Sequence, residues 1–138
     1  MKSKFFSTAP LSLDFGLLLL RLVSGGIILT HGFPKLQKIL SGTLQFGDPV
    51  GLGQETSLYL SMFAEVICAI FVVLGLFTRI ALIPLIINMA VAFFIVHTAD
   101  NFATKELALI FLGMFVVLFF TGPGQFSIDK GLGTARRR

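Results

Sequence analysis

Two side chains of opposite charge, Arg21 and Glu65, fall inside long apolar stretches of the chain. A charged group in a hydrocarbon layer is paired, protonated or functional, because an uncompensated charge is costly there. Helical rise places Arg21 roughly 12 Å and Glu65 roughly 17 Å from the same membrane face. Two long side chains close a gap of about 5 Å, so the spacing allows an intramembrane ion pair. Such a pair is either a structural clamp between helices or a polar site for a quinone-like head group or for protons.

A second group of polar residues falls near the ends of the apolar stretches. His31 lies at the end of the first stretch and Lys35 follows it, His97 ends the third, and Glu106 begins the fourth. A quinone ring needs hydrogen-bond donors to its carbonyl oxygens and a proton carrier near neutral pH, and imidazole serves both needs. These four residues predict a second candidate site at the outer membrane face. The alternative is that they are ordinary interfacial side chains exposed to solvent.

No metal site is expected from the sequence. The single cysteine, Cys68, lies inside an apolar stretch and has neither zinc-ligand spacing nor a haem attachment motif around it. Its position is typical of a small core residue. Ligation of haem or metal by His31 and His97 is less favoured than hydrogen bonding at the interface.

The composition indicates that the bilayer is the solvent for these residues. The chain has 138 residues, of which 55% are hydrophobic and 13% charged, and its mean hydropathy is +0.92. A soluble domain of this size cannot cover so much apolar surface. We expect one domain, an all-α integral membrane four-helix bundle. The four spans are predicted at about residues 13–32, 58–78, 80–97 and 106–121.

Prolines and glycines set the predicted boundaries. Pro34 is expected to end the first span, because it lacks the N–H of a continuing helix. Residues 36–55 contain four glycines and Asp48-Pro49, so they are either a surface loop or a flap over a site. Pro84 is expected in the first turn of the third span. Asn88, inside that span, is expected to form a hydrogen bond between helices.

Basic residues indicate the orientation of the bundle. Four spans place both termini on one side, which holds Lys2, Lys4, Arg79, Lys130 and Arg136 to Arg138, whereas the other side holds Lys35, Lys38 and Lys105. Positive residues favour the cytoplasm, so both termini are predicted to be cytoplasmic. The basic residues form no face with interleaved aromatics, which argues against a nucleic-acid partner.

Several short motifs, taken together, resemble the DoxX family of small bacterial membrane proteins. The matching pieces are Arg21 with Gly25-Gly26, His31-Gly32-Phe33-Pro34-Lys35, Glu65 with Leu74-Gly75-Leu76-Phe77-Thr78-Arg79, Gly122-Pro123-Gly124 and Ser127-Ile128-Asp129. The resemblance implies a four-helix protein of the bacterial inner (plasma) membrane. It also implies quinone-linked redox work, because the family takes its name from a subunit associated with archaeal quinol oxidation and thiosulfate:quinone oxidoreduction. The residues that match the family pattern are Arg21, His31, Lys35, Glu65 and Arg79.

Three functions remain open. The first is a quinone-linked subunit or accessory partner of a membrane oxidoreductase. The second is a non-catalytic assembly or interaction protein whose buried Arg21–Glu65 pair is structural. The third is a small transporter, which needs a homo-oligomer because four short spans leave little room for a pathway. No flavin or nucleotide motif occurs in the sequence, so a redox cofactor would be a diffusible quinone or belong to a partner.

Overall fold

The computed structural model describes residues 4–136, and the side chains of residues 4–133. Lys2, Arg137 and Arg138, which contribute to the predicted charge bias, lie outside the described residues. Within them, four helices are long and apolar enough to cross a membrane: Leu13–Leu40, Gln54–Leu74, Thr78–Val96 and Phe102–Thr121. All regular elements of this part of the chain are helical, so the predicted all-α class is confirmed.

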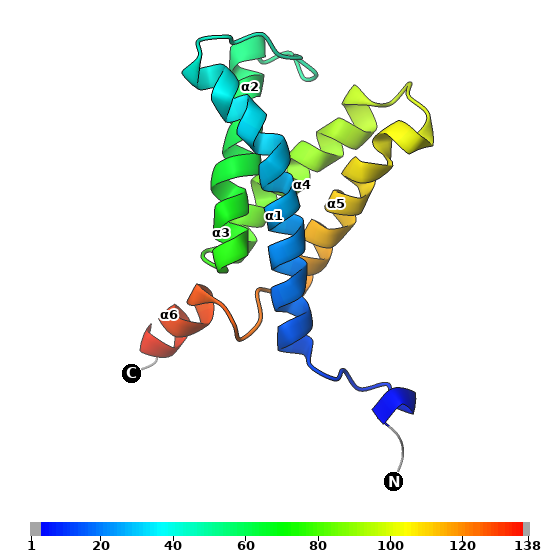
Figure 1. Ribbon diagram of the computed structural model, residues 1–138, viewed down its shortest axis with the longest axis vertical. Helices are drawn as coiled ribbons and strands as arrows, with labels where there is room; N and C mark the ends of the chain where they lie inside the picture. The colour runs from blue at the N-terminus through cyan, green and yellow to red at the C-terminus, as the bar shows by residue number, and fades with distance from the viewer. Residues whose placement is uncertain (1–3, 137–138) are drawn as a thin grey trace.

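The four long helices run alternately up and down. They are α1 (Leu13–Leu40), the rod formed by α2 (Gln54–Met62), η2 (Phe63–Cys68) and α3 (Ala69–Leu74), then α4 (Thr78–Val91) with η3 (Ala92–Val96), and α5 (Phe102–Thr121). Two short helices, η1 (Lys4–Phe6) and α6 (Ile128–Arg136), precede and follow them. Figure 1 shows η1 and α6 toward one end of the bundle, with the connection between α1 and α2 at the other.

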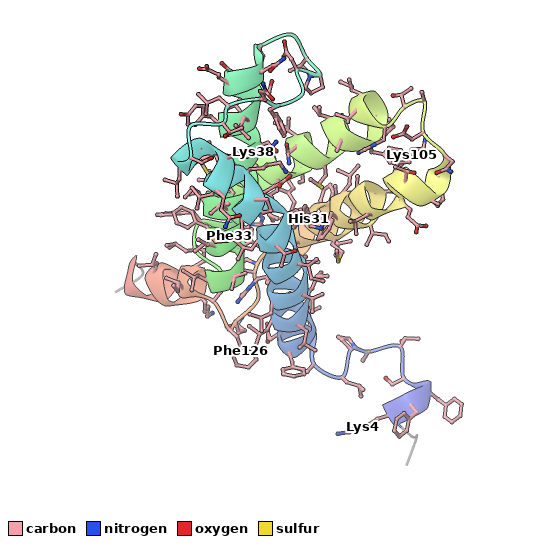
Figure 2. The ribbon with its side chains drawn as sticks, turned by 45° about the horizontal axis from the view of Figure 1, so that its top comes forward. Lys4, His31, Phe33, Lys38, Lys105 and Phe126 are labelled. Atoms are coloured by element: carbon pink, nitrogen blue, oxygen red, sulfur yellow. The ribbon has the colours of Figure 1, made fainter. Side chains whose placement is uncertain are left out.

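Basic side chains lie at both ends of the bundle. Figure 2 shows Lys38 and Lys105 toward the end that carries the α1–α2 and α4–α5 connections, and Lys4, in η1, toward the opposite end. Residues that pack the core come from all four rods and include Ile28, Cys68, Leu82 and Phe115. Many large apolar side chains on the outer surface are exposed, as expected where lipid is the solvent.

The first helix is longer than predicted. It continues through Pro34 to Leu40, so the predicted end near Gly32 is wrong. A proline inside a helix costs about 3 kcal/mol. Ending the helix there would instead leave the last carbonyls without partners close to the apolar layer, where each unpaired group costs several kcal/mol. Continuing the helix is therefore the less costly choice, and residues 36–40 are helical rather than part of a loop.

Helix caps account for the other differences in boundary. The Asn101 side chain accepts from the Thr104 backbone N–H at 3.2 Å, so α5 begins at Phe102, before the apolar run. The second rod begins at Gln54 and ends at Leu74, and the φ of 68° at the following Gly75 gives the left-handed closing turn. Because α4 begins at Thr78, Pro84 lies inside the helix and not in its first turn.

The rods around the cavities described below contain two π-helical segments, η2 and η3. In η2 the Ala69 N–H bonds the Ala64 carbonyl, and at the end of η3 the His97 N–H bonds the Ala92 carbonyl at 3.0 Å. Each bond spans five residues, so each segment holds an extra residue relative to an α-helical turn. Such segments occur frequently at functional sites, because they turn a side chain out of the regular helix pattern. Here they carry Glu65 and lead to His97.

Candidate functional site

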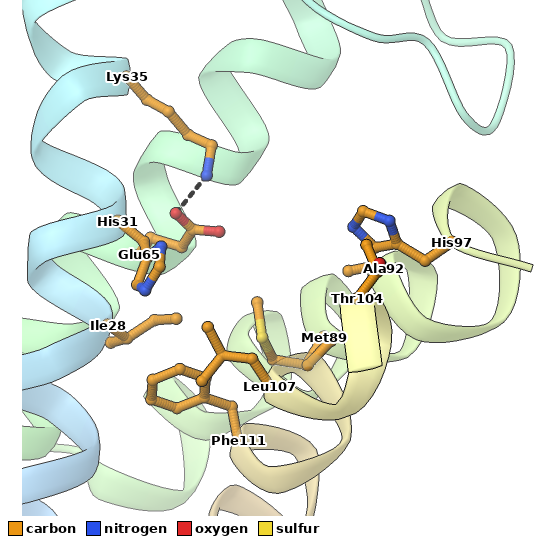
Figure 3. A pocket seen from close by; sticks show the side chains of 11 residues that line it. Ile28, His31, Lys35, Glu65, Met89, Ala92, His97, Thr104, Leu107 and Phe111 are labelled. Atoms are coloured by element: carbon orange, nitrogen blue, oxygen red, sulfur yellow. Dashed lines mark hydrogen bonds and ion pairs between the residues drawn. The ribbon is translucent and has the colours of Figure 1, made fainter. Parts of the chain in front are cut away.

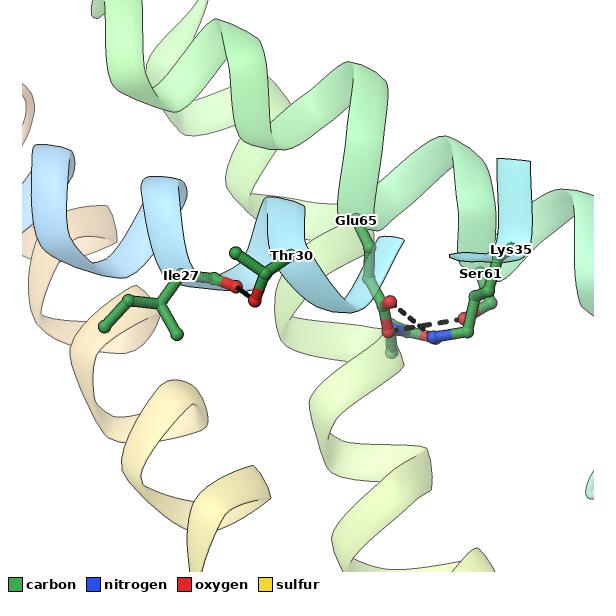
Figure 4. Close-up of polar contacts among 6 residues, drawn as sticks. Ile27, Thr30, Lys35, Ser61 and Glu65 are labelled. Carbon is green, nitrogen blue, oxygen red and sulfur yellow. Dashed lines mark hydrogen bonds and ion pairs between the residues drawn. The ribbon is translucent and has the colours of Figure 1, made fainter. Parts of the chain in front are cut away.

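The Glu65 carboxylate is buried among three of the four rods. It is 3% exposed. Lys35 of α1 pairs with Oε2, and the Asn88 amide of α4 donates to Oε1 at 2.7 Å. The Ser61 hydroxyl donates to the same oxygen at 3.4 Å. Figure 3 shows the Lys35–Glu65 pair at the edge of an open space, and Figure 4 shows Lys35 and Ser61 converging on the carboxylate.

A glycine brings α1 against the Glu65 segment. An ideal Cβ at Gly32 would lie 2.7 Å from the backbone carbonyl carbon of Glu65 and 2.8 Å from its Cβ. Only a residue without a side chain allows this approach. The close contact fixes the depth at which Glu65 lies relative to α1. Because Lys35 is on the same continuous helix three residues later, its amine reaches the carboxylate.

The polar face of α1 follows helical spacing. Ile28, His31 and Lys35 are three and four residues apart, so they lie on one face of the helix, and all three line the same cavity. Lys35 is a half-buried residue whose amine also lies 5.9 Å from the centre of the Phe46 ring. The helix that continues through Pro34 is therefore what places Lys35 inside the bundle and not in an external loop.

Two cavities meet at the Lys35–Glu65 pair. The smaller has a volume of about 290 Å³ and is lined by Ile28, His31, Lys35, Glu65, Met89, Ala92, His97, Thr104, Leu107, Ala108 and Phe111. The larger, of about 600 Å³, is largely apolar and includes residues of the 41–53 connection: Phe46, Pro49, Val50 and Leu52. Both cavities share Lys35, Glu65, Ala92 and His97.

The predicted outer-face residues are brought only partly together. His31, Lys35 and His97 line the smaller cavity, and Glu65 lies with them. The His31 ring packs edge-on against Phe111, with 6.1 Å between ring centres. Glu106 is exposed on α5 and lines neither cavity. Glu65, from the first predicted site, and His31, Lys35 and His97, from the second, therefore belong to a single site. Arg21 and Glu106 are not part of it.

Arg21 does not pair with Glu65, which corrects the predicted ion pair. It is 1% exposed, and it donates from Nη1 to the Pro123 carbonyl at 2.7 Å and from Nη2 to the Val73 carbonyl at 3.3 Å. The turn that follows α5 brings a free carbonyl within reach of the guanidinium. The carbonyls of Pro123, in that turn, and of Val73, in the last turn of α3, accept from the two terminal nitrogens of Arg21, while its buried Nε has no hydrogen-bond partner among the described residues. Lys35 is the cation that the extended α1 brings to Glu65. Arg21 therefore joins the turn after α5 to the bundle.

The same end of the bundle holds Arg79 and Asp129. Arg79 Nε donates to the Phe119 carbonyl at 3.0 Å, so it satisfies the last turn of α5 and does not reach Glu65. Asp129 accepts from the backbone N–H groups of Phe77 and Thr78 at 2.7 and 2.9 Å. It thereby caps the N-terminus of α4 from a distant part of the chain. The sequence reasoning noted Asp129 only within a motif and did not identify this capping role.

Within residues 4–136, no group of three or more histidine, cysteine or acidic side chains is arranged to hold a metal ion. Cys68 is buried and has no disulfide partner. Asn88, expected to bond between helices, is the residue that joins α4 to Glu65. The polar side chains that face the cavities thus include the donors Lys35 and Asn88, which suit a ligand with oxygen acceptors, beside the accepting Glu65 carboxylate.

The apolar helices and the charged cluster between them define a multi-pass membrane protein with polar groups enclosed in its helix bundle. The DoxX family model matches residues 16–98. The chain is also 31% identical over 122 residues to an uncharacterized protein of Haemophilus influenzae, covering 80% of this chain and 86% of that protein. No solved structure matches the chain significantly. The protein therefore belongs to the DoxX family.

Proposed function

We propose that the protein binds a quinone-type ligand beside the Lys35–Glu65 pair and serves as a quinone-linked subunit or accessory partner of a membrane oxidoreductase. The observation that carries this proposal is the position of the buried Glu65 carboxylate. It lies where a largely apolar cavity of about 600 Å³ meets a smaller, more polar one. Ligand sites are typically apolar hollows with a few placed polar groups.

The donors around Glu65 suit the oxygens of a quinone ring. An ammonium group has three N–H donors and an amide nitrogen has two. Lys35 and Asn88 each direct one donor at Glu65, which leaves further donors for a carbonyl oxygen. The apolar walls of the larger cavity, including Phe46 and Leu60, suit the ring and an isoprenoid tail. The family resemblance to quinone-linked systems adds independent support.

We further propose that the membrane is the bacterial inner membrane and that both termini face the cytoplasm. The excess of basic residues in the terminal segments supports this orientation. Lys38 and the 41–53 connection would then face outward, and the cavities would open in the outer half of the bilayer. A ligand that diffuses in the membrane would enter from that half.

Mass spectrometry of the lipid extract tests the proposal. The wild-type protein, Glu65→Gln and the control Glu106→Gln are purified in the same mild detergent, and their secondary structure is compared. We expect quinone to co-purify with the wild type and with the control, and to be lost from folded Glu65→Gln. The proposal fails if quinone is equally abundant in all three samples. It also fails if none of the samples contains quinone and none of them retains quinone that is added after purification.

A non-catalytic assembly partner remains the second candidate function. The specific observation in its favour is that both terminal nitrogens of Arg21 donate hydrogen bonds to backbone carbonyls, as expected of a charge with a structural role. Affinity capture distinguishes this candidate. It predicts that a membrane partner co-purifies equally with the wild type and with Glu65→Gln, whereas a quinone-dependent complex weakens in the variant.

A further inference from the structure

His97 forms a second polar end of the cavities, opposite Lys35 and Glu65. It follows η3, and its ring lines both cavities. Figure 3 shows His97 on the far side of the open space from Lys35 and Glu65. A ligand in this space would thus meet polar groups from two directions.

Asp100 determines which nitrogen of His97 is available. The Nδ1 atom lies 2.7 Å from Asp100 Oδ2. A carboxylate oxygen only accepts, so Nδ1 must carry the proton of this hydrogen bond. The remaining nitrogen, Nε2, has no hydrogen-bond partner among residues 4–136. It is an acceptor when the imidazole is neutral and a donor when the imidazole is protonated.

This inference rests on the proposed quinone-type ligand. We propose that His97 binds the ring oxygen of that ligand that lies away from Lys35 and Glu65. Through His97, the relative affinity for the oxidised and the reduced ligand then depends on pH. A neutral ring accepts from the hydroxyl of the reduced ligand. A protonated ring donates to the carbonyl oxygen of the oxidised ligand. Asp100 is a positioning residue, because it acts through the orientation and charge of His97. The ligand class is therefore a ring with oxygens on opposite edges.

The other titratable and charged groups around the cavities are unchanged in the variant that replaces His97. Those that line a cavity are His31 and Lys35 of α1 and Glu65 of η2. Those on neighbouring segments that line neither cavity are Lys38, Asp48, Glu55, Lys105 and Glu106. Lys105 lies over the Phe93 ring at 5.2 Å. A pH response that comes from any of these groups persists when His97 is replaced.

Binding of ubiquinone-1 and ubiquinol-1 to detergent-purified protein under argon tests the inference. The ratio of the two dissociation constants is measured between about pH 5 and pH 8, the range in which imidazole changes its charge. In the wild type and in Glu106→Gln, we expect preference for ubiquinone-1 to rise three- to tenfold as the pH falls, the effect of about one hydrogen bond. In His97→Gln the ratio should be flat. In Asp100→Asn the change of the ratio with pH should be weaker than in the wild type, because the carboxylate that holds the proton on Nδ1 and orients the ring is gone.

The outcomes separate this inference from the proposed function. If the wild type binds both probes with a ratio that does not change with pH, or if His97→Gln keeps the wild-type profile, the role of His97 is overturned while quinone binding stands. If the wild type binds neither probe, the proposed function itself fails and the role of His97 fails with it.

Discussion

Lys35 of α1 pairs with Glu65 in the π-helical segment η2. The buried carboxylate is thus compensated by a lysine that lies beyond a proline in the first helix. Both residues border two cavities. The charge pair is therefore a structural tie between two rods and also a polar surface that a ligand can reach.

The stability losses from removing each partner of this pair are expected not to add. Lys35→Met leaves the buried Glu65 carboxylate without its cation, and breaking a buried pair typically costs about 3–5 kcal/mol. The double variant Lys35→Met with Glu65→Gln should be destabilised by less than the sum of the single changes. Unfolding in mixed detergent–SDS micelles measures all four corners of the cycle. Additive losses would show that the two residues do not interact.

The contacts of Arg21 predict loss of stability with unchanged ligand binding. Arg21→Gln removes two charged hydrogen bonds to the Pro123 and Val73 carbonyls, so we expect a loss of about 2–4 kcal/mol in unfolding free energy. The fraction that remains folded should bind quinone as the wild type does. The charge swap Arg21→Glu with Glu65→Arg should fold no better than either single change. Recovery of stability in the swap would contradict the observed partners.

Two glycines of α1 form a matched pair for testing the contact with Glu65. A Cβ at Gly32 would lie 2.7 Å from the Glu65 carbonyl, whereas a Cβ at Gly26 meets nothing within 4 Å. Gly32→Ala should therefore destabilise the protein by about 1–3 kcal/mol and weaken ligand binding, because it pushes the two rods apart. Gly26→Ala should be neutral or stabilise by up to about 1 kcal/mol. Thermal unfolding in detergent measures both, and equal effects would argue against this helix contact.

Asp129 is expected to be a stability residue only. It caps α4 by accepting from the N–H groups of Phe77 and Thr78, and loss of such a cap costs about 0.5–2 kcal/mol. Asp129→Ala should lower the unfolding temperature without changing quinone binding at saturation. The exposed Asp48, which accepts from the Ser57 hydroxyl at 3.3 Å, serves as the control in Asp48→Ala. A larger loss for the control would contradict the capping role.

The architecture could be predicted from sequence because it depends on composition. Long apolar stretches separated by polar residues and glycines are enough to indicate four membrane helices. The involvement of Glu65, and of Asn88 as an interhelical partner, also followed from one rule. Polar groups within apolar spans must find partners.

The partner of Glu65 could not be predicted, because the choice depends on tertiary structure. Depth along each helix made Arg21 the nearest cation to Glu65. Nothing in the sequence pattern indicates that the turn after α5 returns to Arg21 with the Pro123 carbonyl. The sequence pattern also placed Lys35 outside the bundle, because Pro34 usually ends a helix. The signal that could have corrected this is the spacing of Ile28, His31 and Lys35 on one helical face.

Photo-cross-linking with an azidoquinone, followed by peptide mass spectrometry, tests most directly that the ligand binds between the helices at Lys35 and Glu65. The account predicts labelling of cavity residues in the 41–53 connection and in α4, such as Phe46 and Val91. Excess unlabelled quinone should compete with this labelling, and Glu65→Gln should abolish it. Labelling confined to lipid-facing residues such as Ile80 and Phe120, without competition, would contradict the account.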